Sequence, residues 1–136
     1  MIVMVCVDDN NGMMFHERRQ SQDRVLRQHM LKLAGEKKLW MNAYSRGQFS
    51  KEDESCIAVA ENGFANIRPG EYCFLEQEDP AQYQEQIETL ILFRWNRSYP
   101  ADLHFGMDLS DWKLIKTEEF AGYSHEKITQ EYYVRR

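Results

Sequence analysis

The stretch Met1–Leu33 decides the fold, and it opens with the sequence MIVMVCVDDNNG. Met1–Val7 is an unbroken apolar run, which is typical of a strand that is covered on both faces of a sheet. Asp8–Gly12 then interrupts the run with residues that tolerate a positive φ, and it therefore predicts a turn.

A helix is expected later in the same stretch. Ser21 is the predicted N-cap, with Asp23 in the first turn, where the helix dipole favours a carboxylate. Gly35 is expected to end the helix after Ala34. The passage between turn and helix, Met13–Gln20, has no hydrophobic period and is expected to be an exposed loop. The expected helical face carries Val25, Leu26, His29, Met30 and Leu33.

Further strands are predicted from apolar and β-branched runs. They cover Leu39–Met41, Cys56–Ala60, Tyr72–Leu75, Thr89–Trp95, a segment starting at Trp112, and Ile128–Val134. Short helical segments are expected over Ser45–Phe49 and Pro80–Ile87, and Ser98–Asp111 is expected to be irregular. The predicted class is α/β, with a mostly parallel central sheet, flanking helices and an antiparallel C-terminal hairpin. A chain of this length predicts one domain over residues 1–136.

Charge is distributed unequally along the chain, whose formal net charge is −5. His16–Lys38 sums to +4, so the remainder sums to −9. An acidic surface disfavours nucleic acid and anionic membranes as partners. The basic segment also lacks aromatic residues interleaved for base stacking. We therefore expect neither nucleic acid nor a membrane as a partner.

The cysteines indicate a reducing compartment. Cys6, Cys56 and Cys73 occur singly, without C-x-x-C spacing, and are expected to be small core residues. The opening apolar run is too short for a membrane span and lacks the flanks of a signal peptide. A cytoplasmic location is the resulting expectation.

Motifs for metal or nucleophilic chemistry are missing from the sequence. The four histidines have no HxH or HExxH spacing, so no metal site is expected. His29 lies on the apolar helix face and is expected to be a hydrogen-bonded core residue. Ser110-Asp111 and Ser124-His125 lack a nucleophile-elbow pattern, and no P-loop is present.

Several segments, in their order along the chain, resemble the dihydrofolate reductase family. The resemblance rests on the opening strand with its turn, the spacing from Gly12 to Asp23, and the segments Leu39–Asn42, Asp102–Phe105 with Asp111-Trp112, and Glu119–Tyr133. It implies that Asp23 occupies the place of the carboxylate that binds the pterin ring in that family. A nicotinamide cofactor would then deliver hydride at the switch point of the sheet.

The sequence departs from the family where the cofactor would bind. Pyrophosphate needs backbone N–H groups that glycines bring close. The glycine pair after the fourth strand is replaced by Glu76–Asp79, and the second phosphate site reads Asn42–Ser45. Leu103 stands at the position of a threonine that supports the acid, and Arg18, Arg19 and Ser21 replace a tryptophan and prolines. No NADPH or other cofactor is therefore expected.

The basic cluster predicts an anion-binding site. Arg18, Arg19, Arg24 and Arg27 are expected to gather a phosphate, a polyglutamyl tail or an acidic protein. The alternative is a solvated helix face whose charge offsets the acidic remainder. For Asp23, the alternative to a catalytic role is a stabilising contact with the helix dipole, worth about 0.3–1 kcal/mol.

Three functional hypotheses follow, and whether the chain is an enzyme stays open among them. The first is a reductase-like fold without standard NADPH-dependent activity, which binds an anionic small molecule or an acidic protein. The second is a reductase of a pteridine-like substrate that uses Asp23 and NADPH. The third is a structural or homo-oligomerising module with exposed Trp and Tyr residues as its contact surface.

Overall fold

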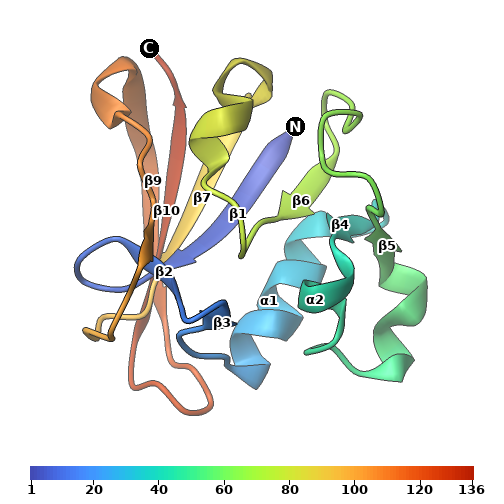
Figure 1. Ribbon diagram of the computed structural model, residues 1–136, viewed down its shortest axis with the longest axis horizontal. Coiled ribbons are helices and arrows are strands. Elements are labelled where there is room, and N and C mark those ends of the chain that lie inside the picture. The colour runs from blue at the N-terminus through green and yellow to red at the C-terminus, as the bar shows by residue number, and fades with distance from the viewer.

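The computed structural model describes residues 1–136 and is built around a seven-stranded sheet (Figure 1). The strand order is β5-β4-β6-β1-β7-β10-β9. The bounds are β1 (Ile2–Val7), β4 (Leu39–Met41), β5 (Ile57–Val59), β6 (Tyr72–Phe74), β7 (Thr89–Arg94), β9 (Trp112–Phe120) and β10 (Ile128–Arg135). The pairs among β1, β4, β5, β6 and β7 are parallel, and β10 runs antiparallel to β7 and β9. The predicted α/β class with an antiparallel C-terminal hairpin is confirmed.

The helical segments are α1 (Arg24–Ala34), α2 (Ala43–Arg46) and the 3-10 helices η1 (Lys51–Cys56), η2 (Pro80–Gln86) and η3 (Leu109–Asp111). Helix α1 ends at Gly35, as predicted, and Gly35 has a φ of 60°. The predicted N-cap was wrong, because Asp23 rather than Ser21 caps the helix. Helix α2 begins two residues before the predicted segment, because the Asn42 side chain accepts from the Ser45 N–H and caps it. No helix is long and apolar enough to cross a bilayer.

The central strand β1 separates two apolar layers. Val3, Val5 and Val7 pack on one face with residues of β2, the η2 region and the turn before β9. Met4 packs on the other face with Leu26 and the rest of the buried stripe of α1. This burial on both faces explains why β1 appears in the sequence as a continuous apolar run.

The two crossovers from β1 and β6 define a switch point between these neighbouring strands. The chain leaves β1 through α1 on one face and reaches β4, whereas it leaves β6 through η2 on the opposite face and reaches β7. Open α/β sheets bind ligands at such a point, outside the carboxyl ends of the strands. Asp8 and Glu76 follow those two ends, and both are buried.

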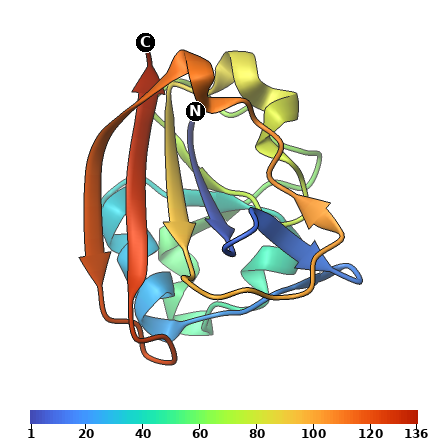
Figure 2. The same ribbon diagram turned by 90° about the vertical axis from the view of Figure 1, so that its left-hand side faces the viewer.

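A second, three-stranded sheet corrects the prediction of an exposed loop over Met13–Gln20. It consists of β3 (Arg18–Arg19), β2 (Gly12–Phe15) and β8 (Leu103–His104), all antiparallel (Figure 2). Met13 and Met14 are buried in it. Strands of two to four residues are too short to produce a hydrophobic period, and they exist here because they pair with one another. Strand β8 and η3 also give order to part of the segment Ser98–Asp111.

The cysteines are not all core residues. Cys73 is buried, and burial raises the pKa of its thiol to about 12. Cys6 is half-buried in β1, whereas Cys56 is exposed at the end of η1, which contradicts the prediction for that residue. The apolar run Cys56–Ala60 begins one residue before β5, so its first side chain lies outside the sheet.

Candidate functional site: a carboxylate closed by a distant loop

Asp23 lies at the start of α1 with extended backbone angles, φ −151° and ψ 127°. Its Oδ1 accepts from the N–H groups of Val25 at 2.9 Å and Leu26 at 3.2 Å. These contacts satisfy two of the N–H groups that a helix leaves unpaired at its first turn. The side chain is 0% exposed, so the carboxylate belongs to the interior.

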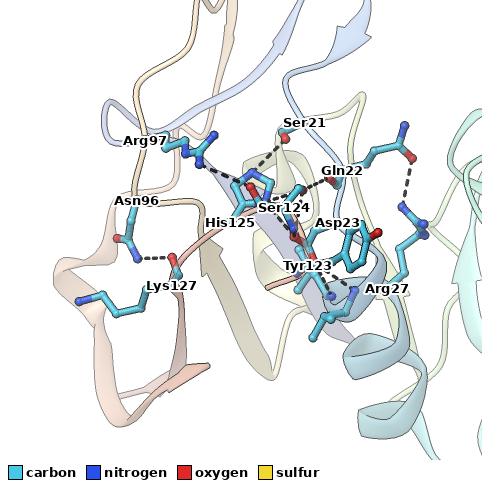
Figure 3. A network of polar contacts seen from close by, with 12 residues as sticks. Ser21, Gln22, Asp23, Arg27, Asn96, Arg97, Tyr123, Ser124, His125 and Lys127 are labelled. Carbon is cyan, nitrogen blue, oxygen red and sulfur yellow. Dashed lines mark hydrogen bonds and ion pairs between the residues drawn. The ribbon is translucent and has the colours of Figure 1, made fainter. Parts of the chain in front are cut away.

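The loop between β9 and β10 supplies the remaining partners of this carboxylate (Figure 3). The Tyr123 N–H donates to Oδ1 at 3.0 Å, and the Ser124 N–H donates to Oδ2 at 2.9 Å. The Ser124 hydroxyl and the His125 Nδ1 also lie at 3.2 and 2.9 Å from Oδ2. Each oxygen therefore has three donors, although a carboxylate offers about four acceptor positions in all. Asp23 has no acceptor capacity left for an external ligand.

His125 is buried and oriented by groups on both sides of its ring. The ring stacks on Trp95 with centroids 4.5 Å apart. Its Nδ1 faces Asp23, and its Nε2 faces the Ser21 hydroxyl at 3.0 Å and the Tyr99 hydroxyl at 3.2 Å. A carboxylate only accepts, so Nδ1 carries a proton, and in the neutral form of the ring Nε2 presents its lone pair to the two hydroxyl groups.

The turn at Gly122 allows the loop to approach Asp23 closely. The Gly122 N–H donates to the His125 carbonyl at 2.9 Å. A Cβ at this position would lie 2.6 Å from Asp23 Oδ2 and 3.0 Å from both the His125 carbonyl and the Ile128 side chain. Only glycine fits here without displacing the carboxylate or the loop.

Groups after β7 hold the loop from the other side. Arg97 Nη2 donates to the Ser124 carbonyl at 3.4 Å, and Asn96 Nδ2 donates to the Lys127 carbonyl at 3.1 Å (Figure 3). The loop is therefore anchored both to the start of α1 and to the end of β7.

Hydrogen bonding controls the charge of Asp23. Burial alone would raise the pKa of this carboxyl, but donors from Tyr123, His125, Ser124 and Leu26 outweigh burial and hold the pKa well below its usual range. Asp23 is consequently a carboxylate at neutral pH. The resemblance implies that a ligand would face this charge, and in this chain the His125 ring faces it.

A second buried carboxylate, Glu76, is paired inside the switch point. Arg19 Nε and Nη2 donate to its two oxygens at 3.0 and 3.2 Å, and Gln48 Nε2 donates to it at 2.9 Å. The guanidinium also lies over the Tyr44 ring at 4.3 Å and donates to the Tyr44 carbonyl. Glu76 is therefore not a free negative charge, as the sequence suggested, but half of a largely buried ion pair at the switch point.

The other acidic residues after β6 are also engaged. Glu78 accepts from the Tyr83 hydroxyl at 2.7 Å, and Asp79 caps η2 through the Ala81 N–H. At the neighbouring helix, the Asn42 side chain already accepts from the Ser45 N–H, which the resemblance assigns to a phosphate. The acidic side chains after β6 and the Ser45 N–H are thus engaged by contacts within the chain.

Asp8 at the end of β1 organises the turn before β2. Its side chain accepts from the N–H groups of Asn10, Gly12 and Tyr99 at 2.7 to 3.0 Å, and from Gln20 Nε2 at 3.2 Å. Burial opposes ionisation, but these donors prevail and lower the pKa of Asp8. The role of this carboxylate is structural, because every donor comes from the chain itself.

The four arginines of the basic cluster are not brought to one place. Arg24 and Arg27 share a depression of about 380 Å³ at the start of α1, together with Gln22, Asp23, Tyr123 and Ser124. Arg24 lies over the Tyr123 ring at 4.3 Å. Arg18 is exposed on β3 and lines a different depression, and Arg19 is committed to Glu76. Partial burial, together with the like charges of Arg19 and Arg24, lowers the pKa of Arg27, although Asp23 opposes this shift.

Other predicted residues have ordinary surroundings. His29 is half-buried, stacks on Phe120 and bonds to Gln130, which agrees with the predicted core role. Leu103 lies in β8, where it pairs with Met14, and is not a partner of Asp23. Ser124 and His125 contact Asp23 instead. No group of three or more His, Cys, Asp or Glu side chains is arranged to hold a metal ion.

Sequence reasoning missed His125, Ser124 and Tyr99 as members of this site. Ser124-His125 was noticed only as a dipeptide without a motif, and it lies about a hundred residues from its partner. The one signal in the sequence is Gly122 between the two C-terminal strands, a residue typical of a turn, but it does not indicate the direction of that turn.

Comparison with solved structures supports the fold described above. No protein-family model and no curated protein sequence matches the chain. Among solved structures, a dihydrofolate reductase from Enterococcus faecalis in complex with NADP(H) and RAB-propyl is similar, with a TM-score of 0.70 and 9% sequence identity. The match covers 99% of this chain and 95% of the enzyme. The chain therefore has a dihydrofolate reductase-like fold.

Proposed function

We propose that the chain is a dihydrofolate reductase-like protein that does not carry out standard NADPH-dependent reduction of a pteridine, and that it binds an anionic small molecule. The observation that carries the first part is the saturation of Asp23 by its own chain. Paired hydrogen bonds from a pterin ring would need both oxygens of this carboxylate, and displacing the loop would leave several buried donors unpaired.

The cofactor side supports the same proposal. The E. faecalis enzyme is described in complex with NADP(H). In this chain the Arg19–Glu76 pair lies at the switch point, and Glu76 is 8% exposed. Removing one member of a buried ion pair leaves an uncompensated charge, so a dinucleotide would have to displace a strongly held group.

The anionic ligand is proposed for the depression beside Arg24 and Arg27. Its volume of about 380 Å³ suits a small molecule better than a protein segment. Two guanidinium groups three residues apart can bind the oxygens of one phosphate or carboxylate. Asp23 also lines the depression, but its oxygens are held by donors of the chain and do not compete for the two guanidinium groups through hydrogen bonds.

The first experiment tests the reductase alternative. NADPH is titrated into the protein while energy transfer from tryptophan to the nicotinamide is followed, and dihydropterin reduction is assayed in parallel. We expect no saturable signal up to about 1 mM, the upper end of common KM values, and no turnover. Saturable binding with reduction of the pterin would instead establish the reductase hypothesis.

The second experiment tests the anion site. Inorganic phosphate and triglutamate are titrated calorimetrically at low ionic strength into the wild type, the Arg24→Ala/Arg27→Ala variant and the control Lys32→Ala. Binding is expected to be lost in the double variant and retained in the control, which removes one exposed positive charge from the same helix. Equal weakening in both variants would indicate nonspecific attraction and reject the site.

An oligomerising module is a second candidate, favoured by one observation. Strand β9 is a sheet edge nine residues long, and Leu114 and Ile115 are 45% and 54% exposed on it. The contact surface predicted from exposed Trp and Tyr residues is wrong for tryptophan. Trp95 and Trp112 are buried and Trp40 is half-buried, whereas Tyr123 is exposed. A melting temperature that rises with protein concentration would support assembly.

A further inference from the structure

The arrangement around His125 has a feature that binding an anion does not use. The Ser21 hydroxyl lies 3.0 Å from His125 Nε2, and His125 Nδ1 lies 2.9 Å from Asp23 Oδ2 (Figure 3). A hydroxyl, an imidazole and a carboxylate are thus connected in series. This is the geometric requirement for a serine nucleophile with an oriented general base.

The contacts of Asp23 and His125 orient the series as such a site needs. Asp23 is a buried carboxylate with the proton of Nδ1 directed at it, which fixes the tautomer of His125. Stacking on Trp95 holds the ring in place. Ser21 is only partly buried, whereas His125 is 4% exposed. Tyr99 donates to the same Nε2 and helps to hold the ring when Ser21 moves.

Donors for a developing oxyanion are available next to Ser21. The backbone N–H groups of Ser21 and Gln22 donate to no acceptor within the protein. In acyl-transfer enzymes the N–H of the nucleophile and of a neighbouring residue commonly bind the oxyanion. Ser21 and Gln22 therefore carry both the nucleophile and two unused donors in one short segment before α1.

The adjacent surface indicates a substrate class. A depression of about 500 Å³ includes Tyr99 and Gln20, which flank the triad, together with Phe15, His16 and Arg18. The rings of Phe15 and His16 stack with centroids 3.8 Å apart, and Arg18 is exposed beside them. Aromatic surface with a free guanidinium suits a ligand that is planar and negatively charged.

We infer that Ser21, His125 and Asp23 form a hydrolytic site for a small carboxylic ester that carries an aromatic ring and a negative charge. Ser21 Oγ bonds to the ester carbonyl carbon while its proton passes to His125 Nε2. The C–O bond to the alcohol then breaks, and the departing alkoxide takes the proton from Nε2. Water, activated by the same nitrogen, attacks the acyl-serine and releases the carboxylic acid, which restores Ser21.

The first experiment measures the reactivity of Ser21 directly. The full chain is treated with a fluorophosphonate, in which the serine oxygen displaces fluoride from phosphorus, and the adduct is located by peptide mass spectrometry. We expect one adduct, on Ser21, that is lost in Ser21→Ala and retained in Ser98→Ala, a control that removes an exposed serine of a neighbouring loop. Absence of a Ser21 adduct on folded wild-type protein overturns the inference.

Ester hydrolysis tests the reaction and its specificity. Release of 4-nitrophenol from 4-nitrophenyl acetate should fall to the buffer rate in Ser21→Ala, and unchanged release in that variant would refute the assignment of the nucleophile. Mono-4-nitrophenyl succinate should show a higher kcat/KM than the acetate, and Arg18→Ala should reduce that ratio. Equal kcat/KM values in the wild type would refute the assigned substrate class.

A cysteine variant keeps the inference testable if both esters prove to be poor substrates. In Ser21→Cys, transfer of the thiol proton to His125 should make the introduced thiol react with iodoacetamide faster than the exposed Cys56 of the same chain. A rate no greater than that of Cys56 would show that His125 does not act as a base toward this position.

Discussion

Replacing Asp23 with asparagine isolates what the closed carboxylate contributes to folding. The variant keeps the size of the side chain, and asparagine caps helices about as well as aspartate. Its amide oxygen can retain the donors Val25, Leu26 and Tyr123. The amide NH₂ then replaces Oδ2. It faces three groups that contact Oδ2 in the wild type, namely the Ser124 N–H, the Ser124 hydroxyl and His125 Nδ1.

The structure allows the cost to be worked out. The Ser124 hydroxyl can turn to accept, and His125 can shift its proton to Nε2, but the Ser124 N–H has no acceptor and costs about 1–3 kcal/mol. The three retained bonds lose charge assistance, at about 1 kcal/mol or less each. We expect a total loss near 4 kcal/mol, against about 0.3–1 kcal/mol if Asp23 only interacts with the helix dipole.

Urea unfolding followed by tryptophan fluorescence measures this difference, because Trp95 lies against His125. A loss near 4 kcal/mol corresponds to a Tm lower by roughly 15 °C. Asp79→Asn is the matched control, since the Asp79 side chain caps η2 through one N–H and should lose less than about 1 kcal/mol. Equal, small losses in both variants would refute the view that loop 123–125 is held by this carboxylate.

Three further predictions concern the same contacts. Since the pKa of Asp23 is lower in the folded than in the unfolded chain, its stabilisation is complete above the unfolded-chain pKa, near 3.9, and is lost as the pH falls below it. Urea midpoints from pH 7 to pH 3 should fall less in Asp23→Asn than in wild type. Arg19→Met should cost about 3 kcal/mol by leaving Glu76 buried and unpaired, and Arg19→Met/Glu76→Gln should recover most of it in the same assay. Gly122→Ala should accelerate amide exchange at Ser124, measured by NMR, because its Cβ would displace the carboxylate; unchanged exchange would contradict the close approach.

The sequence predicts long elements of this fold well, for a physical reason. Strands β1 and β7 are buried on both faces, so they appear as apolar runs, and α1 buries one stripe and ends at a glycine. The strands β3 and β8 have two residues each and no pattern of their own. They form through tertiary pairing with β2, and such pairing leaves no local signal.

Local helix-capping propensities do not predict which residue caps α1. Ser21 and Asp23 are both good N-cap residues, so propensity alone does not choose between them. The choice is decided by donors from Tyr123 and Ser124, about a hundred residues away, which require a carboxylate in this position. Ser21 is left free to face His125. The candidate site could not be predicted from the sequence because the β9–β10 loop assembles it.

Asp23 and Glu76 are engaged by two separate sets of contacts within the chain. This independence strengthens the proposal that standard reductase activity is absent. Residues 123–125 bind the Asp23 carboxylate, whereas Arg19 and Gln48 bind the Glu76 carboxylate. The two sets of contacts share no residue. By the resemblance, Asp23 marks the position of the pterin ring and Glu76 that of the cofactor, and hydride transfer would require both positions at once. Opening either one alone therefore leaves the other obstacle in place. His125, which contacts Asp23, is also the base that we infer for Ser21, so the contacts that argue against the proposed family chemistry supply the geometry for another reaction.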